Sequence, residues 1–217
     1  MRFIGVARFI VIGLSVLPLP VVAADSVKDL TKQARSECSQ GRMAKERDVR
    51  LAHFLKGQAL AERAVSLDEQ RADAHFALFC NLGEQLRIDG ESVTSLFEFR
   101  RMMNELDRTL ELNPGHLDAL SAKGTLLVKL PNVFGGDVEK GERLLQQVIM
   151  REPRAVNARL ALARVRCQDG RHREAMTLAS DALTIARKHK RTEFIPEAKA
   201  VLKQVRSNAA RTNGQRS

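Results

Sequence analysis

The sequence predicts an all-α protein, arranged as a superhelix of about four helical hairpins with a closing helix at its C-terminal end. Alanine, leucine, arginine and glutamate dominate the composition, and these residues favour helix over strand. No run of alternating β-branched residues, the pattern that indicates strands, follows the N-terminal segment. Small residues and prolines recur at the interval of a helical hairpin, which predicts a repeat protein.

The clearest repeat lies between 157 and 182. Leu162 and Ala163 are adjacent, and Gly170, Ala175 and Ala182 follow. This spacing is typical of a tetratricopeptide repeat, a helical hairpin of about 34 residues. Small residues are needed in it because the two helix backbones approach each other closely.

Earlier units follow the same plan, and one of them contains an insertion. Pro114 and Pro153 each end a unit, since proline cannot continue a helix. Gly124 and Gly141 occupy the small positions of the unit between them, with about five more residues separating them than the consensus allows. The insertion is the stretch "LPNVFGGD", in which Asp137 is expected to cap the following helix.

These units define the expected domain and its boundaries. A repeat domain over 25–206 is expected to end with a helix from Pro196 to Arg206, and a disordered polar tail over 207–217 follows it. The expected hairpins pair 27–40 with 43–67, 72–87 with 91–112, 116–129 with 137–151, and 155–168 with 171–188.

The first 24 residues have the three parts of a secretory signal peptide. "MRFIGVAR" is basic, "FIVIGLSVL" is apolar, and "PLPVVAA" ends in small residues. Cleavage is expected after Ala23 or Ala24. The apolar run is too short for a membrane span, which needs about 20 residues. We therefore expect a periplasmic or secreted protein.

The segments "LELNP", "LP..FGGD" and "A.ARLALA...C..GR..EA" together resemble a family. They are similar to the T-component-like proteins of TRAP transporters and to the regulator of microtubule dynamics proteins, over about 52–182. The resemblance implies an all-helical superhelix that binds other molecules or acts as a scaffold. The chain departs from the standard repeat at Arg159 and Arg166, which stand at the usual Trp and Tyr positions. It also lacks the cysteine that often anchors TRAP-type proteins to lipid.

Enzyme motifs are absent from the sequence. It contains no GxSxG, no HExxH and no dinucleotide fingerprint after a strand. The histidines lack metal-ligand spacing and are expected to be structural; they are His53, His75, His116, His172 and His189. We therefore expect no catalytic site, no cofactor and no bound metal.

The formal net charge of the chain is +10, and the excess is concentrated in 151–191. Export and the lack of interleaved aromatic and basic residues argue against a nucleic-acid partner. A basic C-terminal region is compatible with contact to an anionic envelope surface, and equally with ordinary solvated surface.

The first helix of each hairpin is expected to line a concave groove. Repeat spacing places twelve residues there, and they change from acidic to basic along the axis: Asp73, Phe76, Cys80, Glu84, Asp118, Ser121, Thr125, Lys129, Asn157, Leu160, Arg164 and Gln168. Such a groove suits an extended protein or peptide partner. The leading hypothesis is an exported protein-binding adaptor. The alternative is a small-ligand carrier or an accessory of a TRAP-type transporter, as the resemblance implies.

Two local features complete the expectations. Cys38 and Cys80 fall on the first helices of neighbouring hairpins, so they are the favoured disulfide if export oxidises the protein. The loop "LPNVFGGD" has two interpretations. In the structural one, which we favour, Leu130, Val133 and Phe134 fold back over the apolar end of the hairpin. In the functional one, Phe134 is exposed and anchors a partner.

Overall fold

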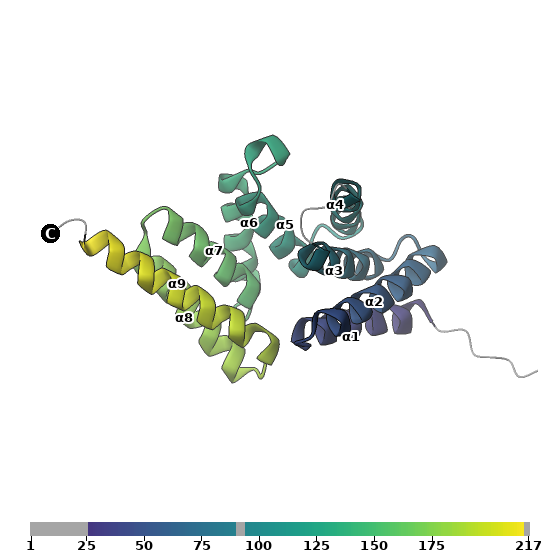
Figure 1. Ribbon diagram of the computed structural model, residues 1–217. Helices are drawn as coiled ribbons and strands as arrows, with labels where there is room; N and C mark the ends of the chain where they lie inside the picture. Colours follow the sequence, from purple (N-terminus) through teal and green to yellow (C-terminus); the bar gives the residue numbers. More distant parts are fainter. Residues whose placement is uncertain (1–25, 90–93, 215–217) are drawn as a thin grey trace, which may run out of the picture.

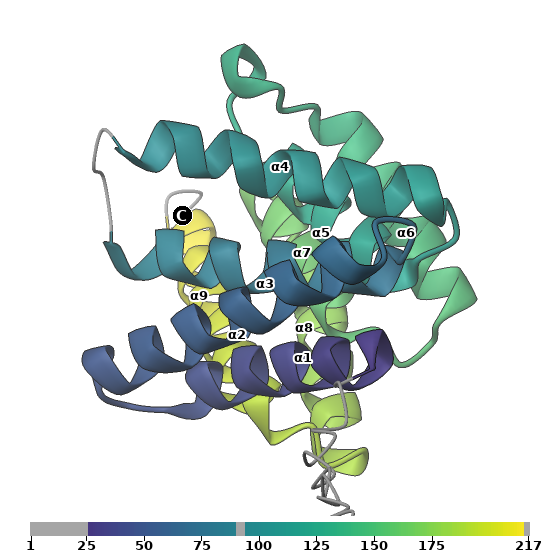
Figure 2. The same ribbon diagram turned by 90° about the vertical axis from the view of Figure 1, so that its right-hand side faces the viewer.

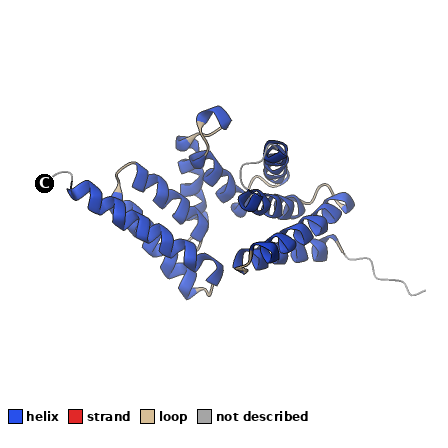
Figure 3. Ribbon diagram, viewed as in Figure 1, coloured by secondary structure: helices blue, strands red, loops and turns tan. Residues whose placement is uncertain are grey.

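The computed structural model describes residues 26–89 and 94–214, and every regular element in them is helical (Figure 3). The expected signal peptide and its cleavage site lie outside these residues. The elements are α1 (Val27–Met43), α2 (Arg47–Leu67), α3 (Ala72–Asp89), α4 (Thr94–Leu112), α5 (Leu117–Lys129), η1 (Asn132–Phe134), α6 (Val138–Arg151), α7 (Val156–Gln168), α8 (His172–Lys188), η2 (Thr192–Phe194) and α9 (Ile195–Gly214).

The helices form an arch of consecutive hairpins, with α1 and α2 at one end and α8 and α9 at the other (Figure 1). Within each hairpin the second helix packs along the first, and α1, α2, α3 and α4 run side by side (Figure 2). The structure confirms the predicted fold class, a tetratricopeptide-like all-α superhelix of four hairpins and a closing helix.

On α1, α3 and α5 a glycine faces the second helix of the same hairpin. A Cβ atom at Gly41 would lie 2.4 Å from the Phe54 ring of α2, and one at Gly124 would lie 3.1 Å from the Gly141 carbonyl of α6. On α3, a Cβ atom at Gly83 would lie 3.2 Å from Met102 Sδ of α4. Close approach of the two backbones therefore sets the geometry of the hairpins.

The junction between α1–α4 and α5–α9 is more polar than the hairpins themselves. α3 and α5 scarcely contact each other. Arg35 of α1 contacts Asp118 at 3.1 Å, and Lys123 of α5 contacts Asp107 of α4 at 2.7 Å. Hydrophobic clusters lie within each half, and Leu110 and Leu126 reach across the junction.

The helix α9 continues beyond the expected end at Arg206. It runs to Gly214, so the expectation of a disordered tail is wrong for residues 207–214. Ala209 and Ala210 favour helix, and the Asn208 amide donates a hydrogen bond to Cys167 Sγ at 3.3 Å. This contact ties the extension of α9 to α7.

The loop between α5 and α6 does not fold back on the hairpin. The exposed fraction is 85% for Val133 and 63% for Phe134, so the expectation that they cover an apolar end is wrong. The Asp137 amide donates to the Leu127 carbonyl at 2.9 Å, and a Cβ at Gly136 would lie 1.8 Å from the Leu130 carbonyl oxygen. The loop is thus a tight backbone turn that leaves its apolar side chains in solvent. Asp137 caps α6 as predicted, accepting from the Lys140 amide.

We expect Phe134→Ala to change the free energy of unfolding by less than about 0.5 kcal/mol, because the ring loses little buried area. Urea unfolding of the two proteins measures this. A loss of several kcal/mol would show that the ring is buried in solution.

The buried carboxylate of Glu37 joins α1 to α2 and makes the free energy of unfolding depend on pH. Glu37 contacts His53 Nδ1 at 2.7 Å and Lys56 Nζ at 2.6 Å. Burial by itself would raise the pKa of Glu37, but hydrogen bonds from His53 and Lys56 outweigh it, and the pKa lies below the ordinary 4.5. A carboxyl with a lowered pKa in the folded state stabilises the fold above its unfolded pKa, and this stability is lost as the pH falls through the folded pKa.

We therefore expect the free energy of unfolding of Glu37→Gln to fall less than that of the wild type when the pH is lowered below about 4.5. Urea unfolding at neutral and acidic pH measures the slope for both proteins. If the two slopes were parallel, another group would be responsible for the acid sensitivity.

Candidate partner groove

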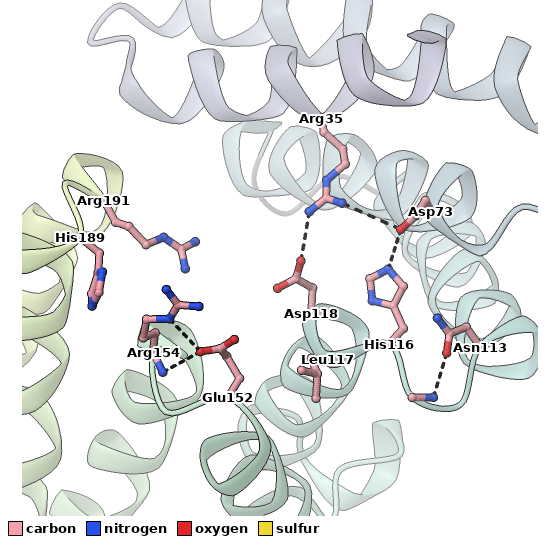
Figure 4. Close-up of a pocket in the computed structure, with 11 residues that line it drawn as sticks. Arg35, Asp73, Asn113, His116, Leu117, Asp118, Glu152, Arg154, His189 and Arg191 are labelled. Atoms are coloured by element: carbon pink, nitrogen blue, oxygen red, sulfur yellow. Dashed lines mark hydrogen bonds and ion pairs between the residues drawn. The ribbon is translucent and has the colours of Figure 1, made fainter. Parts of the chain in front are cut away.

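The inner side of the arch carries a cavity of about 700 Å³. Its charged and imidazole groups come from α1, α3 and the start of α5 on one side, and from the α6–α7 and α8–η2 turns on the other (Figure 4). These residues are Arg35, Asp73, His116, Asp118, Glu152, Arg154, His189 and Arg191. The cavity therefore joins parts of the chain that are far apart in sequence.

The first wall of the cavity carries two carboxylates, which Arg35 and His116 hold in place. Arg35 lies between Asp118 (3.1 Å) and Asp73 (3.9 Å). His116 caps α5: its Nδ1 accepts from the Ala119 amide at 3.2 Å, so Nε2 is the nitrogen that carries hydrogen toward Asp73 at 3.2 Å. These contacts fix both carboxylates at the edge of the groove.

The second wall is basic. Arg154 and Arg191 extend toward the cavity opposite Asp118, with His189 beside them (Figure 4). The Arg154 amide donates to Glu152 at 2.9 Å, and this hydrogen bond lowers the pKa of the Glu152 carboxyl. Arg191 lies over the Phe194 ring, 4.5 Å from its centroid, which restrains the guanidinium. Carboxylates on the first wall thus face arginines on the second wall across the cavity.

A second group of charges lies further along the inner helices, around Lys129. The side chain of Lys129 is exposed, but desolvation by the surrounding helices lowers its pKa, and the nearby positive charge of Arg164 lowers it further. Arg164 is paired with Glu197 at 2.8 Å. On α3, Glu84 is paired with Arg42 at 2.8 Å and with Arg87 at 3.3 Å. In the described part of the chain, Lys129 itself has no carboxylate in ion-pair contact.

Two of the twelve residues predicted for the groove line this cavity. Asp73 and Asp118 line the cavity, and Lys129 and Arg164 lie within electrostatic reach of each other. Thr125 is half-buried on the stripe of α5 that connects Asp118 to Lys129, and its hydroxyl donates to the Ser121 carbonyl. Asn157 and Gln168 are exposed near the two ends of α7.

Other residues predicted for the groove are buried or half-buried and contribute to packing. Leu160 is 1% exposed and belongs to the core of α7, α8 and α9, so its placement in the groove is wrong. Ser121 and Glu84 are also buried, at 7% and 4% exposed. Phe76 stacks on Phe79, with ring centroids 5.6 Å apart, and is half-buried.

The structure joins Cys38 to Cys80 in a disulfide, with their Cα atoms 6.5 Å apart. Cys80 is therefore a link between α1 and α3, and not a free groove side chain. Cys167 is free and buried. The oxidation of this pair in the exported protein stays a prediction, and a thiol count tests it.

The groove residues that sequence reasoning missed come from turns and from neighbouring hairpins. Arg35, Arg154, His189 and Arg191 line the cavity, yet none of them follows the spacing of the first-helix stripe. The concentration of basic residues in 151–191 was the available signal for three of them.

The described residues offer no group of three His, Cys, Asp or Glu side chains that could hold a metal ion. The same residues include no helix with the length and apolar character needed to cross a membrane.

No family model matches the chain, and a comparison with curated proteins gives no match. Two solved structures have a similar arrangement of helices. "MamA RS-1 ArsTM double mutant" is 15% identical, with a TM-score of 0.45, over 86% of this chain and 98% of that chain. "MamA 41-end from Desulfovibrio magneticus RS-1" is 16% identical, with a TM-score of 0.45, over 85% of this chain and 97% of that chain.

Proposed function

We propose that the protein is an exported protein-binding scaffold, without a catalytic role, whose groove holds an extended segment of a partner protein. The observation that carries this proposal is the charge arrangement of the groove. Carboxylates at one wall of the cavity face arginines at the other. Further along α5, Lys129 lies near Arg164 and has no ion pair among the described residues. A segment with side chains of both signs would complete these charges.

The small-ligand alternative is not favoured by the character of the cavity. A carrier of small ligands is expected to have an enclosed, mostly apolar pocket. The cavity here is lined mainly by charged and imidazole groups, and Leu117 is the one large apolar side chain in it. Its open, charged walls suit a chain that passes along the groove.

Site-specific photo-crosslinking in cells tests the proposal. A photoreactive amino acid at Thr125, on the stripe of α5 between Asp118 and Lys129, is expected to give an adduct with a discrete partner protein. The same group at Asn104, an exposed residue of the second helix α4, is expected to give none. An adduct of equal yield from Asn104, or no adduct from Thr125, would contradict a groove-bound partner.

Charge reversal sharpens the same experiment. Lys129→Glu is expected to lower the yield of the Thr125 adduct, because a like charge would then face the acidic part of the segment. Lys140→Glu makes the same change of net charge at an exposed position near the start of α6 and should leave the yield unchanged. Equal loss in both variants would indicate a nonspecific electrostatic contact.

A further inference from the structure

The series of small residues on the first helices ends at α9. Leu202 follows Ala163 by the same number of positions as Ala163 follows Gly124. Leu202 on α9 therefore stands where the earlier first helices α5 and α7 carry a small residue. In the described residues α9 has no second helix of its own. Leu202 packs into the core shared with α8 and is larger than the small residues at the earlier positions.

A cleft of about 470 Å³ opens beside this position, between α8 and α9. Leu183 and Leu202 are its apolar lining. The other large side chains around it are all cations, namely Arg187, Lys199, Lys203 and Arg206, and its lining includes no carboxylate. Three of these cations follow one another along a single stripe of α9.

The cations of the α8–α9 cleft differ from other cations of the protein in their pairing. Arg42, Arg164 and Arg166 each contact a carboxylate of another helix. Across the part of the chain that the structure describes, none of the four cleft cations forms an ion pair. Their positive charge is therefore available to an external anion.

We propose that the α8–α9 cleft binds the anionic headgroups of a lipid bilayer. This goes beyond the protein-binding groove, which lies on the inner side of the arch. Four cations without a carboxylate among them match the negative charge of anionic headgroups. Leu202 is 8% exposed, so it cannot insert into the acyl region, and the attraction is electrostatic. Binding should therefore require anionic lipid and be reversed by salt.

Flotation with lipid vesicles tests the proposal on the natively processed protein. Vesicles containing phosphatidylglycerol in phosphatidylcholine should bind it, and vesicles of phosphatidylcholine alone should not. The measured quantity is the fraction of vesicle-bound protein that high salt releases. Binding through an uncleaved apolar N-terminal segment would resist salt and is thereby left out. Lys199→Gln/Lys203→Gln/Arg206→Gln should lower the partition coefficient about 100-fold, as expected for three cations near an anionic surface.

A matched variant separates this site from the general positive charge of the chain. Lys28→Gln/Lys32→Gln/Lys45→Gln removes the same charge from exposed lysines at the other end of the arch, and its binding should stay within a few-fold of the wild type. Equal loss in the two variants would overturn the proposal. So would equal binding to uncharged vesicles. Binding to soluble polyglutamate that depends on the cleft, without binding to phosphatidylglycerol vesicles, would assign the cleft to an acidic protein instead.

Discussion

Replacing Arg166 with alanine is expected to lower the free energy of unfolding by about 3–5 kcal/mol. Arg166 stands at the Tyr position of the standard repeat and is 5% exposed. Its guanidinium contacts Glu142 of α6, and Glu174 of α8 at 3.5 Å. An ion-pair network thus occupies the position of the usual aromatic ring, and removing Arg166 leaves the half-buried Glu142 carboxylate without its partner.

Urea unfolding measures this effect, and α6 supplies a matched control. Arg143 pairs with Glu139 one turn away on the exposed face, so Arg143→Ala should cost less than about 0.5 kcal/mol. The double variant Arg166→Ala/Glu142→Ala should be less destabilised than the sum of the single changes. A loss below 1 kcal/mol for Arg166→Ala would mean that the network is solvated.

Reducing the Cys38–Cys80 disulfide is expected to lower the free energy of unfolding by about 4 kcal/mol, because the bond closes a long loop in the unfolded chain. The two cysteines are 42 positions apart and link α1 to α3. Urea unfolding with and without reductant measures the difference. Cys167→Ala should retain this response to reductant, and Cys38→Ala/Cys80→Ala should lack it.

A thiol count on the denatured protein shows whether the bond is present. Without reductant we expect one reactive thiol, that of Cys167, and after reduction we expect three. Three thiols before reduction would rule the bond out.

The fold could be predicted from the sequence because its signals are local. Small residues, prolines and glycines repeat at hairpin intervals, and each acts on the helix that contains it or on the neighbouring helix. The tail was mispredicted for the same reason. Residues 207–214 form a polar segment when read on their own. The contact between Asn208 and Cys167 joins two helices that are distant in sequence, so the local pattern does not predict it.

The groove could be predicted only in part, because it depends on which helices meet. Repeat spacing placed Asp118 and Lys129 on one stripe of α5; Asp118 lines the cavity, and Lys129 lies near Arg164 outside the cavity lining. The same spacing also placed Leu160 there, although α8 and α9 bury it. Arg35 and Arg191 come from hairpins far apart along the chain, and only the curvature of the arch brings them to one cavity.

The polar junction between α1–α4 and α5–α9 gives the protein a defined mechanical weak point. Pulling its two ends apart would first separate Arg35 from Asp118 and His116 from Asp73, since these contacts bridge the junction. The hydrophobic clusters inside each half would stay intact. We therefore expect the two halves to separate at this junction, where the apolar side chains of Leu110 and Leu126 cross it, before any helix unfolds.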